Sequence, residues 1–183
     1  MDRVELCNKG YNFVRSSTKP GKVLAMPKGQ QMKDSPTCIL FDMSREHGKF
    51  KGFKIKFPQD AYHNSNTAVE ETHTVFVNRV IIVAESCIFT DSARLEMVLT
   101  RVSGDQVKEQ FNLASWIPVR GYTLACSPTH LVFVGGYVTN SQNLEECSNE
   151  LQVMLLEDFS QGRLQKLRLN TARRSPAVAF GNL

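Results

Sequence analysis

His130-Leu-Val-Phe-Val-Gly-Gly-Tyr-Val138 carries the clearest strand pattern in this sequence. Its apolar part, Leu131–Val134, is rich in β-branched and aromatic residues and is followed by two adjacent glycines, Gly135 and Gly136. A run of this length that ends at Gly-Gly predicts a buried strand rather than a helix. The glycines allow positive φ where a strand ends abruptly or another segment comes close.

Similar apolar runs recur at a regular spacing along the chain. Val80–Val83 begins 51 positions before Leu131, and the weaker run Val23–Met26 begins 57 positions before Val80. Around each run the pattern predicts four short strands, with the longest connection between the second and the third. Such units at this period are typical of the blades of a β-propeller. A β-sandwich also has many short strands and is the alternative, but the repeated order of elements favours the propeller.

The chain is therefore expected to be all-β, a single propeller region over residues 1–183 with about three four-stranded antiparallel blades and the first strand of a fourth. The expected blades cover about 9–58, 67–114 and 120–170, and the fourth begins at about 173–183. The expected strands are Tyr11–Arg15, Lys22–Met26, Cys38–Asp42, Phe50–Phe57, Thr72–Val77, Arg79–Val83, Leu95–Val102, Val107–Leu113, Gly121–Cys126, Leu131–Val134, Leu151–Leu156, Leu164–Leu169 and Arg173–Phe180. Asn143–Glu150 is expected to form at most a brief turn of helix.

A closed propeller needs about four to eight blades, and an open arc would leave strand edges unpaired. We therefore expect that the chain is a fragment, or that another polypeptide or self-association supplies the missing blades. No run approaches the roughly 18 apolar residues that a membrane-spanning helix needs, so no membrane partner is expected. The N-terminus, Met1–Cys7, lacks the apolar core of a signal peptide.

Charge is distributed unevenly along the 183 residues, although the net charge is only +4. Residues 1–56 hold 12 Lys and Arg against 5 Asp and Glu, residues 57–160 hold 5 against 13, and residues 161–183 hold 5 against none. Two basic ends thus flank an acidic middle. This asymmetry suggests an electrostatic partner such as nucleic acid, whereas the simpler interpretation is scattered surface lysines.

Residues typical of an active or metal site are not grouped in this sequence. Its four histidines show no metal-binding spacing, and its five cysteines include no Cys-x-x-Cys pair. Cys38, Cys87 and Cys126 lie in apolar runs and are expected to be buried thiols. The adjacent pairs Glu70-Glu71 and Glu145-Glu146 should point to opposite faces of extended chain. No catalytic residue, metal or cofactor is therefore expected, and the protein is not expected to be an enzyme.

Several residues resemble the consensus of Kelch repeats. That consensus ends one blade on an aromatic residue, begins the next with an arginine and closes its second strand on Gly-Gly. Trp116, Arg120, Gly135 and Gly136 match these positions, and Arg173 matches the arginine of the next unit. Leu167 stands near the expected second aromatic, while Pro27-Lys28-Gly29 and Ala84-Glu85-Ser86 replace Gly-Gly in the first two units. The resemblance implies that these residues are structural markers of blades.

Within the Kelch proteins, the chain is similar to the family of the second recombination-activating protein, the accessory subunit of the V(D)J recombinase, and its transposon-encoded relatives. The matching residues are Gly29-Gln30, Lys33, Ser35-Pro36-Thr37, Phe41-Asp42 and the basic run Lys49–Lys56. This resemblance implies a non-catalytic subunit docked on a catalytic recombinase or transposase, with its basic N-terminal blade near DNA. Lys33 is the implied DNA contact, although Met32 stands where a second basic residue would be expected.

The basic residues of the first blade are the remaining candidates for contact with a partner. They would neutralise phosphates without reading bases, and they are Lys22, Lys28, Lys33, Arg45, Lys49, Lys51, Lys54 and Lys56. Lys28, Lys33, Lys49 and Lys51 are the DNA-proximal candidates, and a nuclear location follows from that role. The alternative is a Kelch interaction module, such as a ubiquitin-ligase substrate adaptor or a cytoskeletal scaffold, with a cytoplasmic location.

Overall fold

The computed structural model describes residues 11–16, 21–27, 37–43, 49–54, 67–77, 80–89, 92, 94–103, 106–178 and 180. Within these ranges the protein is all-β and contains no α-helix. No helix in these ranges is long and apolar enough to cross a membrane.

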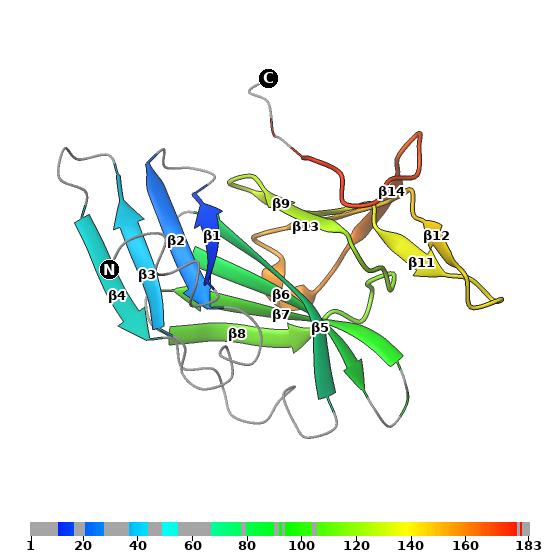
Figure 1. Ribbon diagram of the computed structural model, residues 1–183, viewed down its shortest axis with the longest axis horizontal. Helices are drawn as coiled ribbons and strands as arrows, with labels where there is room; N and C mark the ends of the chain where they lie inside the picture. Colours follow the sequence, from blue (N-terminus) through cyan, green and yellow to red (C-terminus); the bar gives the residue numbers. More distant parts are fainter. Residues whose placement is uncertain are drawn as a thin grey trace.

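Three four-stranded antiparallel sheets follow one another along the described chain (Figure 1). The first consists of β1 (Tyr11–Arg15), β2 (Lys22–Pro27), β3 (Thr37–Asp42) and β4 (Lys49–Lys54). The second consists of β5 (Thr67–Val77), β6 (Val80–Phe89), β7 (Arg94–Ser103) and β8 (Gln106–Asn112). The third consists of β9 (Thr123–Cys126), β10 (His130–Val134), β13 (Glu150–Leu155) and β14 (Gln165–Arg168). In each sheet the strands lie side by side in chain order, so the expected succession of short antiparallel strands is confirmed.

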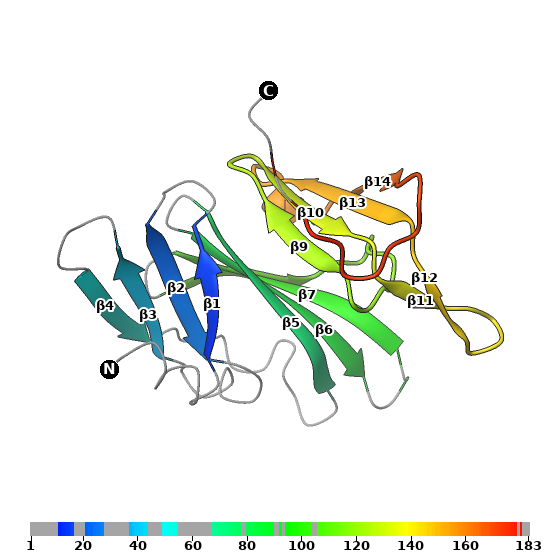
Figure 2. The ribbon, with the colours of Figure 1, turned by 45° about the horizontal axis from the view of Figure 1, so that its top comes forward.

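The three sheets are related to one another through their first strands. β1 contacts β5, and β5 contacts β9 (Figure 2). At the first of these boundaries, Ser16 and Phe76 form an isolated parallel bridge. The last strands β4, β8 and β14 form the opposite edges of their sheets. The second sheet therefore lies between the other two, and the first strands form one continuous row.

Apolar side chains on the two faces of the second sheet form two separate cores. Ile82 and Ala84 of β6 belong to the core shared with the third sheet, the 2–3 core, which includes Tyr122 and Phe133. Neighbouring residues of β6 belong to the core shared with the first sheet, the 1–2 core, which contains Leu24, Cys38, Phe76, Ile81, Val83 and Val102. Side chains alternate across a strand, so one continuous apolar run can fill both cores. This explains why Val80–Val83 lacks the polar alternation of a half-exposed strand.

The connection between β10 and β13 differs from its expected structure. It contains an additional hairpin of β11 (Tyr137–Thr139) and β12 (Glu145–Cys147), where only a turn of helix was expected. The Asn140 side chain organises the hairpin tip, because its Oδ1 accepts hydrogen bonds from the N–H groups of Gln142 and Leu144. A short 3₁₀ turn, η2 (Phe159–Gln161), instead lies between β13 and β14.

The expected strands at both ends of the third sheet are also corrected. β9 begins at Thr123 rather than at Gly121, because Gly121 has a left-handed φ of 59°. The expected strand Arg173–Phe180 does not form over residues 173–178. Ser175 there has a φ of 43°, and Pro176 has no N–H to donate to a strand ladder. This segment instead packs as coil against the ends of β9 and β10.

Candidate functional site

Two of the four DNA-proximal candidates, Lys28 and Lys33, lie outside the described residues. Lys49 and Lys51 lie in β4, where their backbones pair with Asp42 and Leu40 of β3. Gly52 is an ordinary member of the ladder and does not shift the register.

Lys22, another basic candidate, has an acidic neighbour within its own sheet. Its Nζ lies 3.9 Å from a carboxylate oxygen of Asp42, and both side chains are about a quarter exposed. Lys49 pairs with the same aspartate on the opposite side, so Asp42 lies between two lysine positions. Lys22 is therefore paired with a carboxylate of its own sheet.

The structure brings four of the five repeat markers together at the end of the third sheet. A Cβ on Gly135 would lie 2.3 Å from the carbonyl oxygen of Arg173, and one on Gly136 would lie 2.5 Å from that of Arg120. The Gly136 N–H donates to the Arg173 carbonyl at 2.8 Å. Only residues without a side chain allow this approach. Gly-Gly thus holds the segment before β9 and the segment after β14 against the end of β10.

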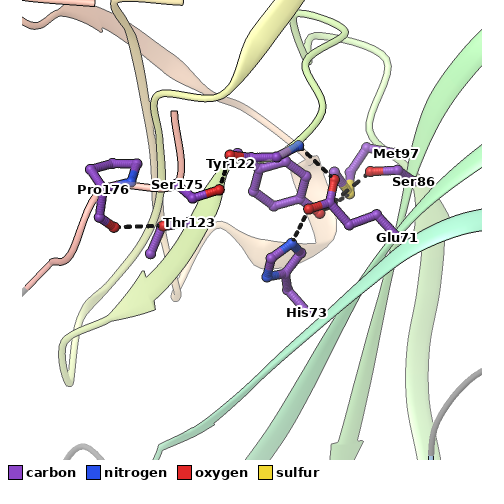
Figure 3. Close-up of polar contacts among 9 residues, drawn as sticks. Glu71, His73, Ser86, Met97, Tyr122, Thr123, Ser175 and Pro176 are labelled. Atoms are coloured by element: carbon purple, nitrogen blue, oxygen red, sulfur yellow. Dashed lines mark hydrogen bonds and ion pairs between the residues drawn. The ribbon is translucent and has the colours of Figure 1, made fainter. Parts of the chain in front are cut away.

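The start of the third sheet is joined to β5 of the second sheet by two carboxylates. Arg120 Nε lies 2.9 Å from Glu70 Oε2, and the Gly121 N–H donates to Glu71 Oε2 at 2.9 Å. Glu71 Oε1 also lies 2.7 Å from His73 Nε2. We call Glu70, Glu71, His73, Arg120 and Gly121 the Glu71 joint; Figure 3 shows its contacts around Glu71. It connects β5 to β9 at the boundary of the two sheets.

Tyr122 continues the joint into the 2–3 core. Its ring lies 4.4 Å from that of His73, and its hydroxyl contacts Ser86 Oγ at 3.5 Å and Met97 Sδ at 3.8 Å (Figure 3). Burial raises the pKa of Tyr122 far above its ordinary value, so its hydroxyl stays protonated. The ring of Trp116, the fifth repeat marker, packs edge-on against Tyr122 at 6.3 Å. Both aromatics stabilise the contact between the sheets.

The joint was missed in the sequence because Glu70-Glu71 was expected to point to opposite faces. A register shift in the β5–β6 pairing between Val69 and Glu71 marks a β-bulge. A bulge re-aims side chains, and here both carboxylates reach the segment that begins the third sheet. The two adjacent glutamates are visible in the sequence. The bulge that turns both of them toward the third sheet depends on pairing with β6, which the sequence does not show.

The described residues include no group of three His, Cys, Asp or Glu side chains that could hold a metal ion. Cys38, Cys87 and Cys126 are buried, as expected, and Cys147 of β12 is exposed. Burial raises the pKa of the Cys38 thiol to about 12, which makes it unreactive.

Two hollows lie beside the 2–3 core. A surface pocket of about 530 Å³ is lined partly by Phe111, Ser115 and Arg163, and the Ser115 hydroxyl donates to the carbonyl of Gly162 at 2.9 Å. A smaller pocket of about 110 Å³ is mainly apolar, with Arg101 and Phe159 at its wall. Among the described residues, no carboxylate, histidine or cysteine lines either pocket.

The described site residues thus form structural contacts, and their chemistry is that of a joint between sheets. Comparison with protein-family models finds no match to this chain. Comparison with curated proteins also finds no match.

Proposed function

We propose that this chain is part of a Kelch-type β-propeller that acts as a non-catalytic accessory subunit of a DNA recombinase or transposase. Its role would be to dock on the catalytic subunit and to lie near DNA. The propeller rests on the way the sheets repeat, and the proximity to DNA rests on the charge distribution.

The order of strands supports a propeller over a sandwich. Each sheet is a four-stranded meander in chain order, with the β11–β12 hairpin inserted between β10 and β13 of the third sheet, and β1, β5 and β9 are neighbours in turn. Propeller blades have this relation, with the first strand of every blade beside that of the next. A sandwich with Greek-key connections would instead exchange strands between two sheets. The contact of Gly135 and Gly136 with the segments around them supports the Kelch type.

The observation that carries the DNA-proximal role is the pair of basic ends. Lys49 and Lys51 occupy the edge strand of the first sheet. At the other end of the chain, exposed basic side chains lie just before β14, within it and in the coil after it, and they are Arg163, Lys166, Arg168, Arg173 and Arg174. Basic side chains at an edge contact phosphates through charge, without sequence preference. The acidic middle would face away from DNA, which gives the complex one orientation. A nuclear location follows from this role.

Salt dependence of DNA binding tests the proposal. A fluorescently labelled duplex and a purified transposase catalytic subunit are titrated with the chain, and fluorescence anisotropy is recorded from 50 to 200 mM NaCl. We expect the chain to raise the affinity of the complex for DNA and the slope against log salt to become steeper. Lys33→Ala and the pair Lys49→Ala, Lys51→Ala should each reduce both effects. Lys108→Ala, in the acidic middle, is the matched control; equal effects of all variants, or none from the wild-type chain, would refute the DNA-proximal role.

One observation favours a second candidate, a Kelch protein-interaction module of the adaptor or scaffold class. The β11–β12 hairpin presents Leu144, 59% exposed, on a tip that Asn140 holds in one conformation. Loops that vary on a rigid scaffold often carry binding functions. If the chain binds neither the catalytic subunit nor DNA, while Leu144→Ala weakens its binding to a ubiquitin-ligase substrate or a cytoskeletal protein, the interaction module is the better assignment.

A further inference from the structure

Residues 173–178 form a coil that crosses the end of the third sheet; we call it the C-terminal strap. It joins no strand ladder. Its hydrogen bonds run to turn and strand-end atoms: the Arg173 N–H donates to the Ser148 carbonyl, and the Pro176 carbonyl accepts from Thr123 Oγ1 at 2.6 Å. The Arg174 guanidinium lies over the ring of Tyr137 at 5.7 Å. The strap can therefore leave the sheet without breaking any pair of strands.

Ser175 is the centre of this attachment. Both its N–H and its hydroxyl donate to the Gly121 carbonyl oxygen at 2.9 Å. Gly121 is also the residue whose N–H is held by Glu71, so Ser175 completes a line of hydrogen bonds from the strap to β5 (Figure 3). Ser175 adopts a left-handed φ of 43°, which is unfavourable for a residue with a side chain, and it is exposed.

We propose that Ser175 is a phosphorylation site for a protein kinase and that its phosphorylation releases the C-terminal strap. In the reaction, Ser175 Oγ attacks the γ-phosphorus of ATP, the new O–P bond forms, and the bond from that phosphorus to the leaving ADP oxygen breaks. The hydroxyl proton passes to the catalytic carboxylate of the kinase. The site does not depend on the DNA-proximal role proposed above.

The local sequence and its exposure carry the assignment. Ser175 stands between two exposed arginines and a proline, Arg173-Arg174-Ser175-Pro176. A serine directly before proline suits proline-directed kinases, and preceding arginines suit kinases with an acidic substrate groove. Kinases bind their substrate segment in an extended conformation. A strap without strand pairing can adopt that conformation, and leaving the left-handed φ of Ser175 relieves strain.

The described chain contains a second Ser-Pro pair that serves as an internal contrast. Ser127-Pro128 forms the turn between β9 and β10. Ser127 Oγ accepts hydrogen bonds from the N–H groups of Thr129 and His130 at 3.3 and 3.0 Å, and the Ser127 N–H donates to the His130 carbonyl. Extending this turn would break the hairpin, so Ser127 should be a poor substrate.

Phosphorylation would reverse the contact that holds the strap. A phosphorylated Oγ has no proton to donate and instead brings negative oxygens to the Gly121 carbonyl, which repels them. The phosphate would also pair with Arg174 and draw it from the Tyr137 ring, because charge-assisted bonds are stronger than a cation–π contact at an exposed site. Both changes favour the released strap.

Site-resolved phosphorylation tests the first half of the proposal. The chain carrying Ser35→Ala, which removes a further Ser-Pro pair outside the described residues, is incubated with ATP and either a proline-directed or an arginine-directed kinase. Tandem mass spectrometry follows each serine. With the proline-directed kinase, we expect Ser175 to be modified at least tenfold faster than Ser127 in the folded chain, while two synthetic peptides containing these sites react at similar rates. Equal rates in the folded chain, or no reaction at Ser175 with either kinase, would overturn the assignment.

Hydrogen exchange tests the release. In the phosphorylated chain, the amides of Ser175, Arg173 and Gly136 should exchange at least tenfold faster, while those of β10 should keep their protection. Ser175→Ala, treated with the same kinase, should retain the protection of the Arg173 and Gly136 amides because it keeps the backbone bonds. Unchanged strap protection in the phosphorylated chain, or release in treated Ser175→Ala, would show that the phosphate does not release the strap.

Discussion

Gly136 lies where two backbone segments approach more closely than a side chain permits. Its φ is 105°, and an added Cβ would lie 2.5 Å from the backbone oxygen of Arg120. We expect Gly136→Ala to lower the free energy of unfolding by about 1–3 kcal/mol, measured by urea denaturation. Gly162→Ala is the control, because its φ is 60° but its nearest neighbour is the Phe111 ring at 3.0 Å, which can move. An equal loss in both variants would show that φ alone, and not backbone crowding, makes Gly136 necessary.

Glu71 and Glu70 are adjacent carboxylates with different expected contributions to stability. Glu71 accepts from the Gly121 N–H and contacts His73, whereas Glu70 makes a half-exposed ion pair with Arg120. Glu71→Gln loses one of two good acceptors and should cost about 1–2 kcal/mol. Glu70→Gln should cost less than about 1 kcal/mol, because partly exposed ion pairs are worth little. Thermal unfolding of the two variants measures both losses of stability. A larger loss for Glu70→Gln would contradict the role of the joint.

Cys38 and Cys147 should differ sharply in reactivity. Cys38 is fully buried with a pKa raised to about 12, while Cys147 is exposed. Iodoacetamide at pH 8 should alkylate Cys147 rapidly and leave Cys38 unmodified, as read by mass spectrometry.

Because folding raises the Cys38 pKa from 9.0, the unfolded state loses this proton first as pH rises. Stability should therefore fall between about pH 9 and 12, and Cys38→Ser should reduce that fall.

At the scale of elements, β6 makes one strand serve two cores. Ile81 belongs to the 1–2 core and Ile82 to the 2–3 core, and both are buried. Ile81→Ala and Ile82→Ala should each cost about 2–5 kcal/mol. Hydrogen exchange should separate them: Ile81→Ala should loosen β2 and β3, and Ile82→Ala should loosen β9 and β10. The same exchange pattern in both variants would mean that the three sheets unfold as one unit.

The strands were predictable wherever an apolar run is bounded by turn residues. Leu131–Val134 before Gly135-Gly136 and Val80–Val83 both gave a central strand of their sheet. The β11–β12 hairpin was not predictable, because Glu145 and its neighbours are polar and the side-chain bonds of Asn140 form its tip. The expected strand Phe50–Phe57 is confirmed by β4 over residues 50–54, and residues 55–57 lie outside the described residues.

For the whole molecule, four of the five expected repeat markers lie together at the end of the third sheet, through contacts that the sequence does not specify. Arg120 and Arg173 approach Gly136 and Gly135 through their carbonyl oxygens, not through their side chains. The Glu71 joint could not be predicted, because it links β5 and β9 across a β-bulge. Contacts between sheets depend on how complete sheets pack, so short motifs mark the repeat without revealing what joins one unit to the next.

The third sheet leaves one apolar face that no other sheet of the described chain covers. Strand register places Ala125, Val132, Val134, Leu151, Val153, Leu155 and Leu167 on the face opposite the 2–3 core. Leu155 and Leu167 are 39% and 42% exposed, whereas Val132 and Val134 on the same face are buried. An exposed apolar area on a sheet face favours association.

We therefore expect the isolated chain to self-associate, with an apparent mass in gel filtration with light scattering that rises with concentration over the micromolar range. The double variant Leu155→Gln, Leu167→Gln should shift the equilibrium toward monomer by about tenfold or more, because it removes the most exposed apolar area from that face. Leu144→Gln removes a leucine that is still more exposed, at 59%, but lies at the tip of the β11–β12 hairpin. It should leave the association unchanged, so an equal effect of both variants would assign association to surface hydrophobicity in general. A compact monomer at all concentrations would refute both the self-association and the need for further blades.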